Sequence, residues 1–254
     1  MKDVIRQQLR KIEVEHNVKI IYACEAGSRA TGLETISSDY DVRFLYIHPI
    51  KWYLSIEKKN DVISKPIYEQ LDLHGWDLHK ALFLFKKSNP TLLEWLHSPH
   101  IYQINEEILL KIKESIPVVF SAKACFYHYL KMASGNFQEV LQQLNTSVKQ
   151  YLNVVRPLLI CLWLEKNKSY PPIQFHTLVH GCHPYIKEDL NNLALLKKGH
   201  TATVNFSTIT TFIEIELDRL STVTKTMLEH KDKGSAPLDE IFTLALENMW
   251  GIKL

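Results

Sequence analysis

An apolar run headed by two aspartates constrains this chain of 254 residues more than any other feature. Asp39 and Asp41 lie at the start of "YDVRFLYI" (40–47), whose β-branched and aromatic residues predict a buried strand. Because side chains alternate along a strand, Asp39 and Asp41 share one face, while Val42 and Phe44 point into the core. Two carboxylates on one face repel each other and are costly to desolvate, so we expect a bound cation to compensate them.

The expected cation is a divalent metal ion. Asp39 and Asp41 are about 7 Å apart along the strand, which lets both carboxylates reach a pair of ions. Two-metal phosphoryl chemistry places two such ions about 4 Å apart, and Mg²⁺ prefers oxygen ligands. We therefore expect two Mg²⁺ (or Mn²⁺) ions at these aspartates.

A third carboxylate is expected from a neighbouring strand. The stretch "IYEQLDLHGW" (67–76) alternates and is interpreted as one strand, in which Asp72 lies opposite Leu71 and Leu73. Asp77 is the rival candidate, although its position predicts the N-cap of the helix that follows. We favour Asp72 because its strand position faces the aspartate pair.

Gly27 and Ser28 stand between the predicted strand "VKIIYAC" (18–24) and a predicted short helix at 29–33. A glycine lets a phosphate approach the backbone, and a serine hydroxyl and helix-start N–H groups can then hold it. Taken alone, Gly27 and Ser28 are more simply interpreted as an ordinary strand-to-helix turn. Asp39 and Asp41, taken alone, are more simply interpreted as turn residues. The combination at this spacing favours the functional interpretation.

The balance between strand patterns and helix patterns changes along the chain. Apolar spacing predicts an amphipathic helix over 2–16, and strand-like alternation becomes scarce after about residue 100. The remaining predicted helices cover 105–115, 121–133, 136–166, 206–230 and 238–249. We therefore expect a small α/β unit (1–100) followed by a helical domain (101–254).

Composition and charge narrow the class of protein. The net charge of +2 is too small to indicate nucleic-acid binding by itself, and no apolar run approaches the ~18 residues of a membrane helix. The four cysteines are widely spaced, without a CxxC pair, and the charged N-terminus lacks the apolar core of a signal peptide. We expect a cytoplasmic protein with no membrane partner.

These motifs together resemble the DNA polymerase β-like nucleotidyltransferase superfamily. The pattern is Gly27-Ser28, a ten-residue gap and then Asp39-Tyr40-Asp41. The fuller stretches "EAGSRATG", "SSDYDVRFLY", "WYLSI", "GWDLHKAL", "KSNPTLLEWLHSP" and "VRPLLICLWL" resemble the bacterial and phage predicted nucleotidyltransferases linked to RNA repair. The resemblance covers roughly residues 20–180.

The resemblance implies an α+β fold, with a minimal nucleotidyltransferase mixed sheet followed by an all-helical domain that closes the nucleotide cleft. It implies that Gly27, Ser28 and Arg29 bind the nucleotide phosphates, and that a helical-domain lysine, Lys149, contacts the triphosphate. Asp39, Asp41 and Asp72 would be the catalytic, metal-binding carboxylates, with Asp72 as the general base.

The implied reaction transfers a nucleoside monophosphate from a nucleoside triphosphate to a hydroxyl, with an RNA end as the expected acceptor. Two alternatives stay open: AMP transfer to a protein or small molecule, and a non-catalytic nucleotide-binding regulatory module. The sequence leaves the choice of nucleotide and the oligomeric state undetermined.

Overall fold

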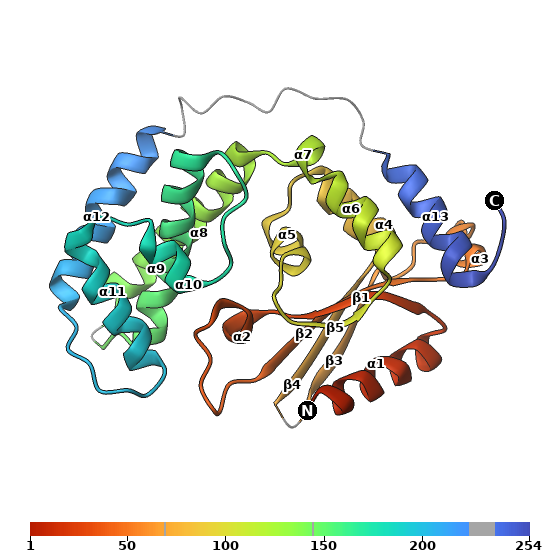
Figure 1. The fold of residues 1–254 in the computed structure, drawn as a ribbon, viewed down its shortest axis with the longest axis horizontal. Coiled ribbons are helices and arrows are strands. Elements are labelled where there is room, and N and C mark those ends of the chain that lie inside the picture. The colour runs from red at the N-terminus through yellow and green to blue at the C-terminus, as the bar shows by residue number, and fades with distance from the viewer. Residues whose placement is uncertain (69, 144, 224–236) are drawn as a thin grey trace. The chain divides into compact units, whose positions relative to one another are not determined.

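The computed structural model describes residues 1–68, 70–143, 145–223 and 237–254 (Figure 1). The chain forms two compact units. The first comprises residues 1–30, 38–120 and 232–254, and the second comprises residues 31–37 and 121–231.

A five-stranded mixed sheet forms the centre of the first unit, in the order β3-β4-β2-β1-β5. The strands are β1 (Lys19–Glu25), β2 (Tyr40–Ile47), β3 (Val62–Tyr68), β4 (Leu71–Asp77) and β5 (Ile101–Ile104). β2 and β4 run parallel, and every other neighbouring pair is antiparallel. The predicted strands at 18–24 and 40–47, and the α+β class, are confirmed.

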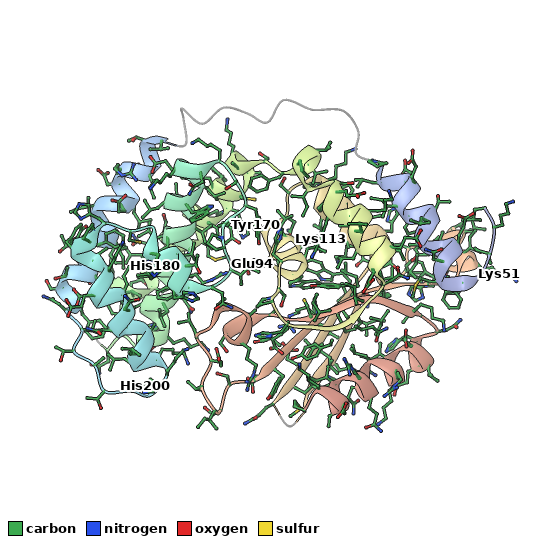
Figure 2. The ribbon with its side chains drawn as sticks, viewed as in Figure 1. Lys51, Glu94, Lys113, Tyr170, His180 and His200 are labelled. Carbon is green, nitrogen blue, oxygen red and sulfur yellow. The ribbon has the colours of Figure 1, made fainter. Side chains whose placement is uncertain are left out.

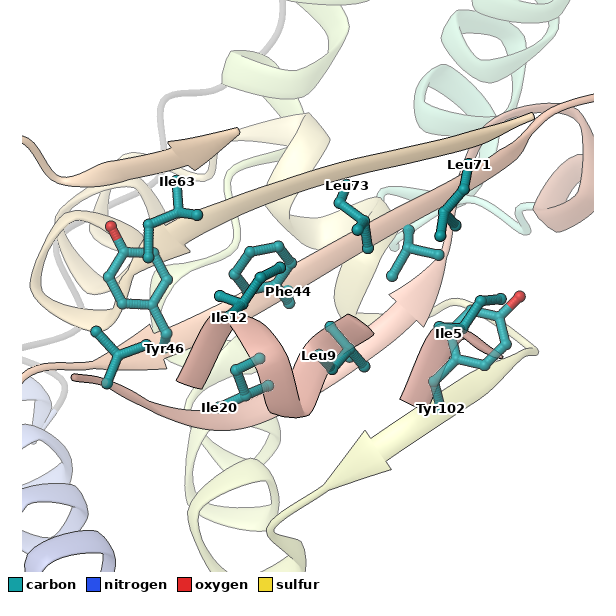
Figure 3. Packing of buried hydrophobic residues seen from close by; sticks show 13 residues of the cluster. Ile5, Leu9, Ile12, Ile20, Phe44, Tyr46, Ile63, Leu71, Leu73 and Tyr102 are labelled. Carbon is teal, nitrogen blue, oxygen red and sulfur yellow. The ribbon is translucent and has the colours of Figure 1, made fainter. Parts of the chain in front are cut away.

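Helix α1 (Lys2–His16) covers one face of this sheet. Its buried residues Ile5, Leu9 and Ile12 recur at helical spacing, as the predicted helix over 2–16 requires. They pack against residues that alternate along the strands, and Figure 3 shows these side chains between the helix and the sheet. The strand residues include Ile20, Val42, Phe44, Tyr46, Ile63, Leu71, Leu73 and Tyr102. Consequently Asp41 and Asp72, which alternate with these residues, belong to the opposite face.

Three helices cover that opposite face of the sheet (Figure 1). They are α4 (Leu78–Lys86), which packs on β2 and β4, α6 (Glu106–Glu114), which packs on β1, and α13 (Leu238–Trp250), which contacts α4, α6 and β2. Shorter helices complete the unit: α2 (Gly27–Thr31), α3 (Ile50–Tyr53), α5 (Pro90–Leu96) and α7 (Ile116–Val119).

The second unit is helical. It contains α8 (Ala122–Leu141), α9 (Val148–Asn167), α10 (Phe175–His180), α11 (Pro184–Lys197) and α12 (Phe206–Val223). Helix α9 packs along α8 and also contacts α10, α11 and α12, so its apolar residues form the centre of this unit.

The prediction of a single strand over 67–76 is wrong. The structure has two antiparallel strands, β3 and β4, with a reversal between Tyr68 and Leu71. Gln70 adopts a left-handed backbone conformation there, with φ of 67°. This conformation favours Gly or Asn, so a glutamine gave no sequence signal of the turn.

Several helix boundaries also differ from prediction. The short helix begins at Gly27 rather than at residue 29. Helix α8 continues through Gly135, and the break before α9 falls at 142–147, where Ser147 and Gln150 form a reciprocal capping box. Helix α12 covers 206–223 of the predicted 206–230, and residues 224–230 lie outside the described residues.

The two units do not follow the expected division at residue 100. The first unit continues to Phe120, because β5 pairs with β1 and α6 packs on the sheet. Helix α13 also belongs to this unit, through its contacts with α4, α6 and β2. A C-terminal segment therefore helps to cover the N-terminal sheet.

Replacing Gly75 by alanine tests the packing of the central strands. A Cβ at Gly75 would lie 2.1 Å from Cε2 of the fully buried Phe44 ring, so Gly75→Ala should lower the free energy of unfolding by about 1–3 kcal/mol. Denaturant unfolding followed by circular dichroism measures the loss. Gly135→Ala, within α8 with no atom within 4 Å of the new Cβ, is the control and should be neutral or stabilising. Equal stability of the two variants would contradict this packing.

Candidate active site

Asp41 and Asp72 lie side by side on the two parallel central strands. In the β2–β4 register, Asp41 is the partner of Asp72. Asp77 instead caps α4: its carboxylate accepts a hydrogen bond from the backbone N–H of His79 at 2.8 Å. The structure thus places Asp72 beside Asp41 and Asp77 at a helix cap, as the sequence predicted, while the catalytic role of Asp72 stays a prediction.

Arg43 bridges the two carboxylates. Its Nη2 lies 2.9 Å from Oδ1 of Asp41 and 2.8 Å from Oδ2 of Asp72, and all three side chains are less than a third exposed. Its Nη1 also donates to the backbone carbonyl of Asp72 at 3.3 Å. The position between the two carboxylates thus already accommodates positive charge.

The electrostatics of Asp41 favour additional positive charge. Burial raises the pKa of the Asp41 carboxyl above its usual value, and the nearby carboxylates of Asp72 and Asp39 raise it further. The Arg43 guanidinium opposes this shift without cancelling it. Two close oxygen-donor side chains with insufficient compensating charge fit a divalent cation.

Gly27 allows the turn before α2 to approach Asp41. Its φ is +57°, and a Cβ at this position would lie 2.0 Å from Oδ2 of Asp41. The backbone N–H of Ala26 also donates to the carbonyl of Asp41 at 2.8 Å. A glycine is therefore required both by the backbone conformation and by the Asp41 carboxylate, and the predicted phosphate-type turn lies directly against a predicted metal ligand.

Glu25 holds the backbone of Asp41 from the buried side. Its Oε1 accepts a hydrogen bond from the Asp41 N–H at 2.7 Å, and its Oε2 accepts one from the Tyr102 hydroxyl. Glu25 is 1% exposed, and burial raises the pKa of its carboxyl. It connects β5 to the first residues of β2 and fixes the position from which the Asp41 side chain projects.

Asp39 takes a different position from its two expected companions. It is exposed and precedes β2, yet its charge reaches Asp41. Within the described ranges, no three His, Cys, Asp or Glu side chains gather closely enough to hold a metal ion together. The structure thus brings Asp41 and Asp72 together and leaves Asp39 at the edge of the pair.

Comparison with known proteins assigns the chain to a family. A sequence model named RlaP and described as the RNA repair pathway DNA polymerase beta family matches residues 1–243. The chain belongs to the RlaP family. A relative from Bacillus subtilis (strain 168), "Uncharacterized protein YcgL", is 38% identical over 255 residues and 98% of each chain.

A solved structure is also similar to this RlaP family member. It is described as a nucleotidyltransferase-like protein from Exiguobacterium sibiricum 255-15, with 14% sequence identity over 87% of this chain and 75% of that one. The TM-score is 0.33, a likeness too low to support an argument about the site. None of the described helices is both long and apolar enough to cross a membrane.

Arg29 and Lys149 are the other two residues of this RlaP family member that were expected to contact the nucleotide. The Arg29 guanidinium donates to the carbonyls of Ser38 at 2.7 Å and Asp39 at 3.2 Å, and lies 3.8 Å from the centre of the Tyr40 ring. Arg29 therefore fixes the segment that enters β2. Lys149 is exposed on the first turn of α9 in the second unit, and its contact with a triphosphate stays a prediction.

A polar and aromatic row on β4 lies beside the aspartates. His74 is the register partner of Arg43, and its Nε2 accepts a hydrogen bond from the Trp76 indole at 3.0 Å. The Trp76 ring lies 4.0 Å from that of Trp95. Burial and the Arg43 charge lower the pKa of His74, which favours a neutral imidazole. The spacing of two between Asp72, His74 and Trp76 is the sequence signal of this row.

The support of Asp41 by Glu25 can be tested by Glu25→Gln. A glutamine has one acceptor oxygen, so its amide group would face either the Tyr102 hydroxyl or the Asp41 N–H and leave a buried donor without an acceptor. The free energy of unfolding should fall by about 1–3 kcal/mol, measured by denaturant unfolding.

Glu13→Gln is the matched control for that variant. Glu13 is half-buried in the same unit, and its Oε1 accepts a single hydrogen bond from the Ile20 N–H at 2.8 Å. A glutamine keeps that acceptor, so the stability should hardly change. If Glu25→Gln were as stable as Glu13→Gln, the proposed support of Asp41 would be contradicted.

Proposed function

We propose that this chain is a metal-dependent nucleotidyltransferase that transfers a nucleoside monophosphate from a nucleoside triphosphate to a hydroxyl group, with an RNA end as acceptor. The register pairing of Asp41 with Asp72, bridged by Arg43, is the observation that carries this proposal. Membership of the RlaP family supports the nucleotidyltransferase class and the RNA repair context.

Asp41 and Asp72 are the residues proposed to hold Mg²⁺ or Mn²⁺, with Asp39, directly before β2, as a further ligand. When bound, these ions would neutralise charge on the triphosphate. Two observations support this fit. The two carboxylates share one position for positive charge, where Nη2 of Arg43 lies. The pKa of the Asp41 carboxyl is also raised.

The bonds that form and break define the proposed reaction. The acceptor hydroxyl oxygen attacks the α-phosphorus, a new phosphoester bond forms, and the bond to the departing pyrophosphate breaks. Asp72 is proposed as the group that accepts the hydroxyl proton. Arg43 contacts both its carboxylate and its backbone carbonyl and thereby orients it, which is the positioning that general-base catalysis needs.

Gly27 and Ser28 are proposed to hold the phosphates. Gly27 brings the backbone against Asp41 without a side chain between them, and Ser28 follows on the first turn of α2. Phosphate oxygens bound at this turn would lie next to the proposed metal ligands. Arg29, whose guanidinium holds the loop before β2, would act on the phosphates only by keeping this turn in place.

Transfer of label from each α-³²P nucleoside triphosphate to RNA with a free 3′ hydroxyl, in the presence of Mg²⁺, tests this function. We expect transfer by the wild type, loss of transfer with EDTA, and a loss of at least about a hundredfold in Asp41→Asn and Asp72→Asn. Asp61→Asn is the control in the same unit, because it removes a half-exposed carboxylate that pairs with Lys80 away from the Asp41–Asp72 pair. It should keep most of the transfer.

Other outcomes of the same assay would overturn the proposal in different ways. Label transferred to a protein or small-molecule acceptor and never to RNA would replace the RNA end as acceptor. Nucleotide binding without transfer to any acceptor would favour a regulatory module. Full transfer by a folded Asp72→Asn variant would remove Asp72 from the catalytic residues.

A further inference from the structure

A cavity of about 530 Å³ opens in the first unit away from the aspartates. Asp41 is the second residue of β2, and His48 directly follows the end of that strand, so the cavity lies about 20 Å away along the strand. Figure 1 shows α3, which contributes Trp52, at the opposite end of the sheet from α2. Its polar and aromatic lining residues are His16, His48, Trp52, Lys59, Asn60 and Ser64.

A stacked aromatic pair forms one wall of this cavity. The rings of His48 and Trp52 stack with centroids 4.1 Å apart and an interplanar angle of 7°. The Tyr53 hydroxyl accepts a hydrogen bond from the His48 N–H at 3.0 Å and donates one to Asp77 at 2.7 Å. Because Asp77 caps α4, the aromatic wall is fixed to the sheet and is in place before any ligand binds.

The charge around the cavity is positive. Lys59 Nζ lies 5.5 Å from the centre of the Trp52 ring, and His16 ends α1 at the same cavity. No carboxylate belongs to its lining within the described part of the chain. Glu15 and Asp61, the acidic residues nearest in sequence to lining residues, are already paired with Lys65 and Lys80.

The side chain of His48 contributes no charge of its own to the cavity at neutral pH. Burial lowers the pKa of His48 to about 4, with the charges of Lys59 and His16 adding to the effect. At neutral pH its ring is therefore uncharged, and the exposed ammonium of Lys59 is the cation of the lining that can pair with an anion.

We propose that this cavity binds one nucleotide unit, with the base on the face of Trp52 that His48 does not cover and the phosphate near Lys59. A planar aromatic wall, an adjacent lysine cation and a volume within the range of small-ligand sites are what a base and its phosphate require together. The nucleotide can come from two sources, a free mononucleotide or a single-stranded RNA. The site is separate from the aspartates, so it stands whether or not they catalyse transfer.

The indole N–H signal of Trp52 in a spectrum of full-length protein with ¹⁵N-labelled tryptophan reports on this cavity alone. Trp52→Phe assigns the signal. Titration with AMP and with an eight-nucleotide single-stranded RNA should shift it, whereas adenosine or inorganic phosphate at the same concentration should shift it much less. Tighter binding of the RNA would identify the strand as the source, and equal binding would identify the free nucleotide.

Two lysine variants provide the decisive comparison. Lys59→Ala should weaken the binding of AMP or RNA about threefold to fivefold through loss of its charge. Lys51→Ala should leave it unchanged, because this exposed lysine of α3, labelled in Figure 2, does not line the cavity. The proposal is overturned if neither AMP nor RNA shifts the Trp52 signal, if phosphate alone shifts it equally, or if the two lysine variants bind alike.

Discussion

The two carboxylates that face each other across parallel strands are the constraint on which the rest of the site depends. Asp41 and Asp72 are register partners, and Arg43 is close enough to contact both. Removing the Arg43 charge would leave two half-buried carboxylates side by side without compensation. The strand order that places β4 beside β2 therefore also determines where positive charge must lie in this unit.

The surroundings of this pair are arranged around Asp41. Gly27 has no side chain where the Asp41 carboxylate lies, and Glu25 accepts the Asp41 N–H from the buried side. Tyr102 donates to that glutamate from β5. Two segments that are distant in the sequence, residues 25–27 and Tyr102 of β5, thus fix one aspartate, which is the preorganisation that the proposed electrostatic catalysis needs. The cavity beside Trp52 lies at the other end of β2 and depends on a different set of contacts, through Tyr53 and Asp77.

Local sequence patterns predicted the positions of Asp72 and Asp77. Alternation placed Asp72 on the face of Asp41, and capping preference placed Asp77 at the start of α4. The reversal at Gln70 was missed because a residue other than glycine adopts its left-handed conformation. Glu25 was missed because its role depends on the pairing of β1 with β2 and β5, which no local pattern specifies. The place of α13 in the first unit is likewise a long-range packing choice.

A crystal structure with Mn²⁺ and a non-hydrolysable nucleoside triphosphate tests the central claim most directly, because anomalous scattering locates the metal independently of the model. The account predicts a Mn²⁺ peak at about 2.0–2.3 Å from carboxylate oxygens of both Asp41 and Asp72, with the phosphates at the turn of Gly27 and Ser28. A bound triphosphate whose Mn²⁺ contacts neither aspartate, with Asp72 bound only to Arg43, would contradict it.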